Sequence, residues 1–479
     1  MASSSMSPSA CLDLSVTAAA EAIRTGEVTS VQLTEASIQA FKEKDAPLNS
    51  LIRLDAEEAL ETAAGLDKLR NAGRLLGPLH GVPMAHKDMY YRAGKICTAG
   101  SKIRSDFRPD YSATAIDRLE AAGAISLATL NMAEFAQNPT GHNAHFGDCK
   151  NPWHTDYCPG GSSSGSGAAV AARLTYAALG SDTGGSIRLP AAMCGVTGIK
   201  GTQTRVSRYG AMPLSFSADN VGPLARTARD CARLMHVIAG HDPKDPTSSR
   251  EPVPDYEAAL DGNVKGLRIG VPVTYFMDDA DPEIVAAITA AMAVLKDRGA
   301  EIIHIELPHM NAVATYGAVL SRAEAGTIHA QWMRERAGDY GIHLSSRIYG
   351  GMAIPANYYV EALARRGPIL RAFAAQVFGK VDVFVAPALR KAVPTLLATD
   401  IDRGTPGAID AFNAVSSNTR AINYLGLPSV SVPCGFDRNG LPIGLMIQGR
   451  PFAEGRILHV ADAYQRMTDW QSRKPPTSA

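Results

Sequence analysis

Short apolar segments alternate with helical stretches between residues 79 and 240, and glycine-rich turns separate them. Residues 124–127 and 176–180 are two such apolar segments. Strands that alternate with helices favour an α/β fold, in which helices pack against a central sheet. The pattern resumes with a strand at 267–273, an alanine-rich helix at 282–298 and a second strand near 302–305. We therefore expect the α/β architecture to extend over most of the chain.

Local signals mark a helix start and a hairpin outside this alternation. Thr29 and Gln32 have the spacing of a capping box, which predicts that a helix begins there. Asn439-Gly440 lies between apolar segments at 429–432 and 445–448. Both residues of an Asn-Gly pair tolerate positive φ, so the pair predicts a hairpin that completes the sheet.

Two further segments interrupt the sheet pattern. Residues 241–256 carry four prolines, which indicates a surface connection. Residues 310–380 are mostly helical and contain several tyrosines. This second segment fits either a cap over a substrate pocket or a helical layer of the core.

Composition excludes several classes of protein. The 479 residues include 47 basic and 47 acidic side chains, and no polybasic run, so no bulk charge attracts nucleic acid. Seven cysteines without a CxxC pair predict reduced thiols in a cytoplasmic protein, with neither a zinc cage nor a disulfide framework. No apolar run approaches the roughly 20 residues that a bilayer requires, and residues 1–10 lack the pattern of a signal peptide.

The glycine-rich stretch PGGSSSGSG at 159–167 is open to several interpretations. Ser166 stands where a P-loop needs lysine, and no third small residue closes a dinucleotide fingerprint. A flexible linker has the same composition. The stretch also matches the G-x-S-x-G elbow of α/β-hydrolases, with Ser163 as nucleophile, although the polar segment before it is a poor buried strand.

A second glycine-rich turn, GSDTGGSIR at 180–188, follows an apolar segment and contains Ser186. Glycines before a serine allow several backbone N–H groups to point into one concavity, as an oxyanion hole requires. Serine is inert at its own pKa and needs a base. Lys87 ends the apolar segment 81–88, where burial would lower its pKa towards the range of a general base.

Together these three segments, GVPMAHKD, PGGSSSGSGAAVAA and GSDTGGSIRLPAAMCGVTGIK, resemble the amidase signature family. Ser162 precedes Ser186 by 24 residues and follows Lys87 by 75, as in that family. The resemblance extends through 427–454 and covers about residues 15 to 470. The chain departs from the family at Gly201 and Thr204, where proline and glycine are usual, so that loop is expected to differ in shape.

The resemblance implies a fold and a mechanism. The fold would be the amidase signature fold, with a large mixed, mostly parallel β-sheet between α-helices (α/β/α). Ser186 would be the nucleophile, Ser162, held on a cis peptide bond, the proton relay, and neutral Lys87 the base. The oxyanion hole is expected at the backbone N–H groups of Thr183, Gly184, Gly185 and Ser186. Substrate contacts are expected at Ser163, Met132 and Arg205, and neither a metal nor a cofactor is expected.

The resemblance also sets expectations for the domain and its partners. We expect one domain over 1–479, with its core at about 60–240 and 380–470. N-terminal helices would occupy 10–75, and a helical insertion at the substrate pocket about 300–380. The expected partner is a small amide or carbamate, without nucleic acid or membrane, and the expected state is a monomer or homodimer.

Three functions remain as alternatives. The first is a cytoplasmic hydrolase that cleaves linear amides, or carbamates as a urethanase does, through an acyl-enzyme. The second is the glutaminase subunit of a tRNA amidotransferase. The third is an esterase of the α/β-hydrolase type that uses Ser163. A scaffold without catalytic activity would show no reaction with serine-directed reagents.

Overall fold

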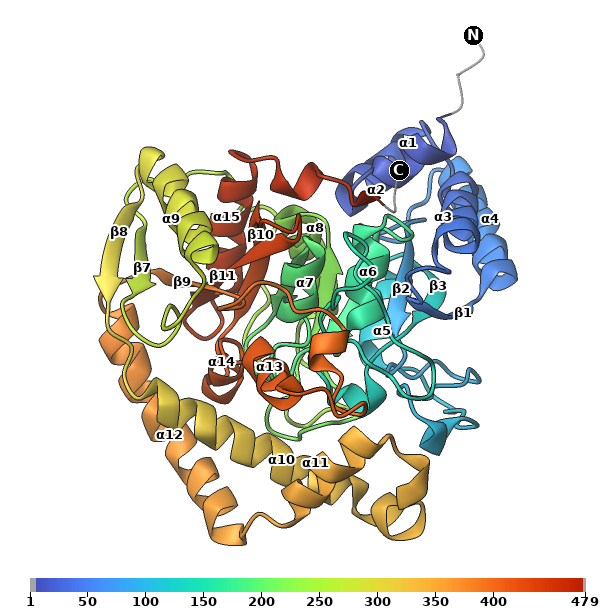
Figure 1. The fold of residues 1–479 in the computed structure, drawn as a ribbon. Helices are drawn as coiled ribbons and strands as arrows, with labels where there is room; N and C mark the ends of the chain where they lie inside the picture. Colours follow the sequence, from blue (N-terminus) through green and yellow to red (C-terminus); the bar gives the residue numbers. More distant parts are fainter. Residues whose placement is uncertain (1–5, 477–479) are drawn as a thin grey trace.

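A single mixed sheet of 11 strands organises the molecule, which is described by a computed structural model over residues 6–476 (Figure 1). In spatial order the strands are β1 (Leu51–Leu54), β3 (Ile125–Leu130), β2 (Pro83–Lys87), β4 (Ala177–Ser181), β6 (Val221–Ala225), β5 (Thr197–Lys200), β10 (Ser429–Phe436), β11 (Pro442–Gly449), β9 (Val383–Pro387), β7 (Arg268–Pro272) and β8 (Glu301–Ile305). The expected α/β fold with a large mixed sheet is confirmed.

Parallel pairing occurs in two parts of the sheet. β2 pairs in parallel with β3 and β4, and β7 pairs in parallel with β8 and β9. The strands between these groups pair antiparallel, from β4 through β6, β5, β10 and β11 to β9. Antiparallel neighbours need only short connections, and β10 and β11 form the hairpin that Asn439-Gly440 predicts.

Fifteen α-helices lie in the described residues. They are α1 (Pro8–Asp13), α2 (Val16–Thr25), α3 (Ser30–Lys44), α4 (Ala56–Asn71), α5 (Thr114–Ala121), α6 (Ser164–Ala171), α7 (Arg188–Cys194), α8 (Ala228–Ile238), α9 (Pro282–Asp297), α10 (Met310–Glu335), α11 (Ile342–Met352), α12 (Ala356–Phe378), α13 (Ala408–Val415), α14 (Arg420–Leu425) and α15 (Glu454–Gln465). The predicted capping box of Thr29 and Gln32 begins α3. None of the described helices is long and apolar enough to cross a bilayer.

Helices cover both faces of the sheet, as alternation along β11 shows. Leu445 and Ile447 belong to the hydrophobic cluster that includes residues of α8 and α15. Met446, between them, belongs to a different cluster with residues of α7. Successive side chains of a strand point to opposite faces, so both faces of β11 are buried. This arrangement is the expected α/β/α layering.

The helices α10, α11 and α12 form an arch along the lower edge of the view in Figure 1, beneath α13 and α14. α10 packs against α11, α12 and α14. Residues from all three arch helices line the cavity described below, among them Ser321, Arg347 and Arg366. Of the two interpretations of this helical segment, the cap over a pocket therefore fits the structure, although none of its tyrosines lines the cavity.

Candidate active site

Lys87 is the last residue of β2, which lies between β3 and β4 in the sheet. All five residues of the strand are buried, and the Lys87 side chain extends towards the carboxyl end of β4. Its Nζ donates hydrogen bonds to Ser162 Oγ at 2.7 Å and to Ser181 Oγ at 2.9 Å. The amine is therefore fixed between two hydroxyls and excluded from solvent.

Burial determines the protonation of this lysine. It lowers the pKa of Lys87 to about 7, and the negative charges of Asp219 and Asp182 offset only part of that effect. An amine with a pKa near 7 is largely neutral just above that pH and can accept a proton.

Ser162 stands at the turn that leads into α6, and its peptide bond to Gly161 is cis. The turn passes very close to another segment, because a Cβ on Gly161 would lie 2.4 Å from Asn138 O. Ser162 O accepts a hydrogen bond from Ala133 N at 3.1 Å. The close packing and this hydrogen bond fix the backbone of Ser162 beside Lys87.

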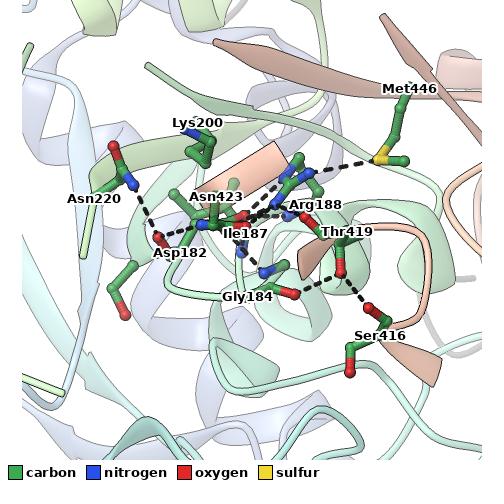
Figure 2. A network of polar contacts seen from close by, with 12 residues as sticks. Asp182, Gly184, Ile187, Arg188, Lys200, Asn220, Ser416, Thr419, Asn423 and Met446 are labelled. Atoms are coloured by element: carbon green, nitrogen blue, oxygen red, sulfur yellow. Dashed lines mark hydrogen bonds and ion pairs between the residues drawn. The ribbon is translucent and has the colours of Figure 1, made fainter. Parts of the chain in front are cut away.

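Ser186 lies on the loop between β4 and α7, which a buried polar network fixes (Figure 2). Arg188 Nε and Nη2 each lie 3.0 Å from an Asp182 carboxylate oxygen, and Asn423 Nδ2 donates to the same carboxylate at 2.8 Å. Burial alone would raise the pKa of Asp182, but Arg188 holds it well below its usual range. Thr419 Oγ1 also donates to Gly184 O, as Figure 2 shows, so the loop is tied to the segment before α14.

The backbone N–H groups of this loop are not all directed alike. The N–H of Gly185 donates to Asp182 Oδ1 at 2.9 Å, so it is committed to the network and not to the cavity. Within the described residues, no acceptor is bonded to the N–H groups of Thr183, Gly184 and Ser186. Gly185 adopts φ +129°, and a Cβ there would lie 2.3 Å from Thr419 Oγ1, so this position requires glycine. Three of the four expected oxyanion donors therefore remain available.

Ser186 lines a cavity together with Thr183 and Gly184. Over the described part of the chain, no hydrogen bond joins Ser162 Oγ to Ser186 Oγ. Hydrogen bonds of catalytic groups are often formed only when substrate is bound. The structure thus brings Lys87 and Ser162 together directly and places Ser186 on the adjacent loop.

The three expected substrate contacts lie away from this cavity. Ser163 Oγ donates to Ser181 O at 3.3 Å and accepts from Ser181 N at 3.2 Å, so its hydroxyl holds the main chain. Met132 is fully buried in the core. Arg205 donates to Tyr256 Oη and to the carbonyls of Glu251 and Pro252. None of the three lines the cavity, because each is committed to internal packing.

The cavity contains residues that no local motif indicates. They come from the arch helices and from the segment around α14, and include Arg322, Arg347, Arg366, Ser416, Arg420 and Asn423. Ser181, the second partner of Lys87, was also missed. Ser181 lies at the end of a predicted strand, five residues before Ser186, and that position was the only available signal.

Comparisons with known proteins agree with this geometry. A family model described as Amidase matches residues 32–458. A glutamyl-tRNA(Gln) amidotransferase subunit from Chloroflexus aggregans is 42% identical over 485 residues, which cover 96% of this chain and 98% of the relative. The peptide amidase of Stenotrophomonas maltophilia superposes with a TM-score of 0.82 at 32% identity, covering 96% and 98% of the two chains.

A third similar protein has been solved in work on a vestigial protein complex that reveals the origins of an s-triazine catabolic enzyme. It superposes with a TM-score of 0.88 at 32% identity, and the match covers 95% of this chain and 98% of that one.

These comparisons correct one expectation. A monomer or homodimer whose only partner is a small amide or carbamate, without nucleic acid, was expected. That expectation is wrong, because the relative from Chloroflexus aggregans is by name one subunit of an enzyme that acts on a glutamyl-tRNA. Carbamate cleavage, by contrast, stays a prediction.

Proposed function

We propose that this chain, which belongs to the amidase family, hydrolyses the C–N bond of an amide with Ser186 as the nucleophile. The observation that carries the assignment is the contact between Lys87 Nζ and Ser162 Oγ, at 2.7 Å inside the protein. A buried amine that donates to a hydroxyl beside a glycine-rich loop can serve as a base without histidine. The esterase alternative is weaker, because the hydroxyl of Ser163 is bonded to the main chain of Ser181.

In the first half of the reaction, neutral Lys87 takes the proton of Ser162 while Ser162 takes the proton of Ser186. Ser186 Oγ then forms a bond to the carbonyl carbon, and the N–H groups of Thr183, Gly184 and Ser186 stabilise the oxyanion. Each such donor contributes about 3 kcal/mol to lowering the barrier. The proton returns from Lys87 through Ser162 to the leaving nitrogen, and the C–N bond breaks.

In the second half, water attacks the ester formed on Ser186. Its proton passes through Ser162 to Lys87, and the tetrahedral intermediate collapses to a carboxylic acid and free Ser186. The relay through Ser162 is thus used in both directions. No residue beyond the pair, Ser186 and the loop N–H groups is needed for these proton transfers.

The similarity to an amidotransferase component supports a context for this chemistry. It covers 96% of this chain and 98% of the relative, so it includes the cavity as well as the glycine-rich segments. We therefore propose that the chain is the ammonia-releasing subunit of a larger enzyme that modifies an aminoacyl-tRNA. This context favours amide hydrolysis over carbamate hydrolysis.

Labelling of the full chain tests the nucleophile. A fluorophosphonate should modify Ser186, and peptide mass spectrometry should locate the adduct there. Ser186→Ala should abolish both labelling and amide hydrolysis. In the matched variant Ser163→Ala, labelling of Ser186 should persist. An adduct on Ser163 in the unmodified chain would contradict the assignment.

Purification tests the context separately. The tagged chain, purified from its own cells, should bring down a second polypeptide in stoichiometric amount, and that complex should release ammonia faster than the chain alone. A chain that copurifies with nothing and is fully active alone would refute the subunit proposal. The assignment of Ser186 would stand in that case.

A further inference from the structure

The cavity that contains Ser186 is lined by four arginines and, among its lining residues, by no aspartate or glutamate. The arginines are Arg322 on α10, Arg347 on α11, Arg366 on α12 and Arg420 at the start of α14. Buried or partly buried arginines are ordinarily paired with carboxylates. Such a set facing a nucleophile therefore requires an explanation.

One of the four is accounted for by the fold. Arg366 donates to Tyr424 O and Ser217 O, each at 2.6 Å, and to Asn423 O at 3.2 Å. Two of these carbonyls belong to the last turn of α14, where intrahelical partners are missing. Arg366 is thus a structural residue that joins α12 to α14.

The other three have almost no partners among the residues that the structure describes. Arg420 Nη2 donates to Ser416 Oγ at 2.6 Å, which is an uncharged acceptor. Arg347 Nε is buried without a hydrogen-bond partner, and its guanidinium lies 5.4 Å from the centre of the Phe412 ring. Arg322 is exposed and forms no ion pair within residues 6–476.

The three charges also act on one another. Burial, together with the positive charges of Arg322 and Arg420, lowers the pKa of Arg347 to about 9. Burial and the charge of Arg322 lower the pKa of Arg420 as well. Like charges that face each other without a carboxylate destabilise the empty protein, and a bound anion would relieve that repulsion.

The cluster is close to the reacting loop. A Cβ on Gly184 would lie 3.4 Å from Arg420 Cγ, so the stem of Arg420 packs against the backbone next to Ser186. Arg347 and Arg322 line the same cavity. An anion held by the three arginines would therefore belong to the molecule whose carbonyl Ser186 attacks.

We infer that Arg322, Arg347 and Arg420 bind a carboxylate group of the substrate, and that the substrate is an amide carrying a carboxylate but no recognised ammonium group. This inference rests on the proposed function of Ser186. A carboxylate offers two oxygens to guanidinium donors, which suits charge-assisted recognition. An ammonium group would meet three positive charges and no acidic lining residue.

The acidic side chains nearest to the cavity are already engaged. A neighbouring hollow shares Gln137, Asn138 and Phe412 with it and contains Asp400 and Asp402. Asp400 pairs with Arg403 at 2.9 Å, and Asp402 accepts from His343 N at 3.0 Å. These carboxylates hold their own loop and do not neutralise the arginine cluster.

Three amides of equal chain length test the inference. Glutaramate carries a carboxylate, pentanamide carries none, and glutamine carries both a carboxylate and an ammonium group. We expect kcat/KM for glutaramate to exceed that for pentanamide by about 100-fold. We also expect glutamine to be no better than glutaramate. Equal rates for glutaramate and pentanamide, or a tenfold preference for glutamine, would overturn the inference.

Variants assign the preference to the cluster. Arg347→Gln and Arg420→Gln should bring the ratio of kcat/KM for glutaramate to that for pentanamide close to one, whereas Arg347→Lys should retain part of it. Arg365→Gln is the matched control, because Arg365 is an exposed residue of α12 outside the cavity and pairs with Glu361. It should leave both rates unchanged. An unchanged ratio in the folded cavity variants would refute the assignment.

A second readout separates this inference from the proposed function. Glutarate should protect Ser186 of the full chain from fluorophosphonate labelling, and pentanamide should not. Protection should be lost in Arg347→Gln while labelling itself persists. If Ser186 fails to label in any condition, the proposed function fails. If Ser186 labels but glutarate gives no protection, only the carboxylate site is refuted.

Discussion

Lys87 is an ionisable amine that is fully buried, and the energetic conflict between those properties gives it a chemical role. Its side chain is 0% exposed, and burial lowers its pKa to about 7. Its two partners are the hydroxyls of Ser162 and Ser181, which accept a hydrogen bond from a neutral as well as from a charged amine. The site therefore tolerates the neutral form that a base requires.

The rate of amide hydrolysis should follow the ionisation of this residue. Because only neutral Lys87 accepts a proton, kcat/KM should rise about tenfold per pH unit below pH 7 and level off above it. Measurement between pH 5 and 9 checks this. Lys200 is the necessary control, because burial lowers its pKa to about 7 as well. Lys200→Met should keep the midpoint, and a midpoint lost in that variant would transfer the titration to Lys200.

Stability should report the same ionisation with a defined sign. The pKa of Lys87 is lower in the folded state than its ordinary value of 10.5, so between about pH 7 and 10.5 the unfolded chain binds the extra proton. The free energy of unfolding of the natural protein should therefore rise relative to that of Lys87→Met by up to about 1.4 kcal/mol per pH unit in this window. Urea unfolding of both proteins at four pH values measures the difference, and a constant difference would contradict the lowered pKa.

At the scale of elements, the loop between β4 and α7 depends on an ion pair that solvent does not reach. The side chains of Asp182 and Arg188 are both 0% exposed. Asp182 also accepts from Gly185 N, Ile187 N and Arg188 N, so one carboxylate organises most of the loop that carries Ser186. The position of the nucleophile is therefore set by a residue that does not touch the substrate cavity.

Asp182→Asn should destabilise the protein strongly. It leaves Arg188 buried without its counter-charge, which costs about 3–5 kcal/mol in the free energy of unfolding. Glu21→Gln is the matched control, because the Glu21–Arg24 pair is exposed on α2. Urea unfolding should show no change for that variant. Equal effects of the two substitutions would refute the structural role of Asp182.

The elements were predictable where the local pattern was strong. The strand at 267–273, the helix at 282–298 and the hairpin around Asn439-Gly440 appear as β7, α9 and the β10–β11 pair. Their periodicity and turn residues are encoded within a few positions of one another. The antiparallel centre of the sheet was not predictable, because the pairing of β4 with β6 and of β5 with β10 is decided by packing between distant segments.

The whole molecule is organised by one continuous sheet. Hydrogen bonds link all 11 strands, and one hydrophobic cluster includes residues from Cys11 to Tyr464. The expectation of a single domain remains a proposal that this continuity supports. It predicts one cooperative unfolding transition, in which far-UV circular dichroism, tryptophan fluorescence and activity change at the same urea concentration. Loss of activity well before the loss of circular dichroism would show that the arch helices unfold independently.

At this scale, the site was predictable only in part. Lys87, Ser162 and Ser186 lie in segments whose glycines and apolar approaches are visible in the sequence. Arg322, Arg347 and Arg420 lie in segments without such signals, and a lone arginine on a helix is usually a surface residue. Their convergence depends on how α10, α11 and α14 meet over the sheet, which no local pattern encodes.

The arch formed by α10, α11 and α12 contributes cavity residues but none of the strands that hold Lys87 and Ser186. Mutations in the arch can therefore change which compound enters without altering the groups that break its bond. Evolution could replace one diet by another in this scaffold through a few helical positions, each tested in an enzyme that still reacts. A lineage built in this way would diversify in what it consumes far faster than in how it cuts.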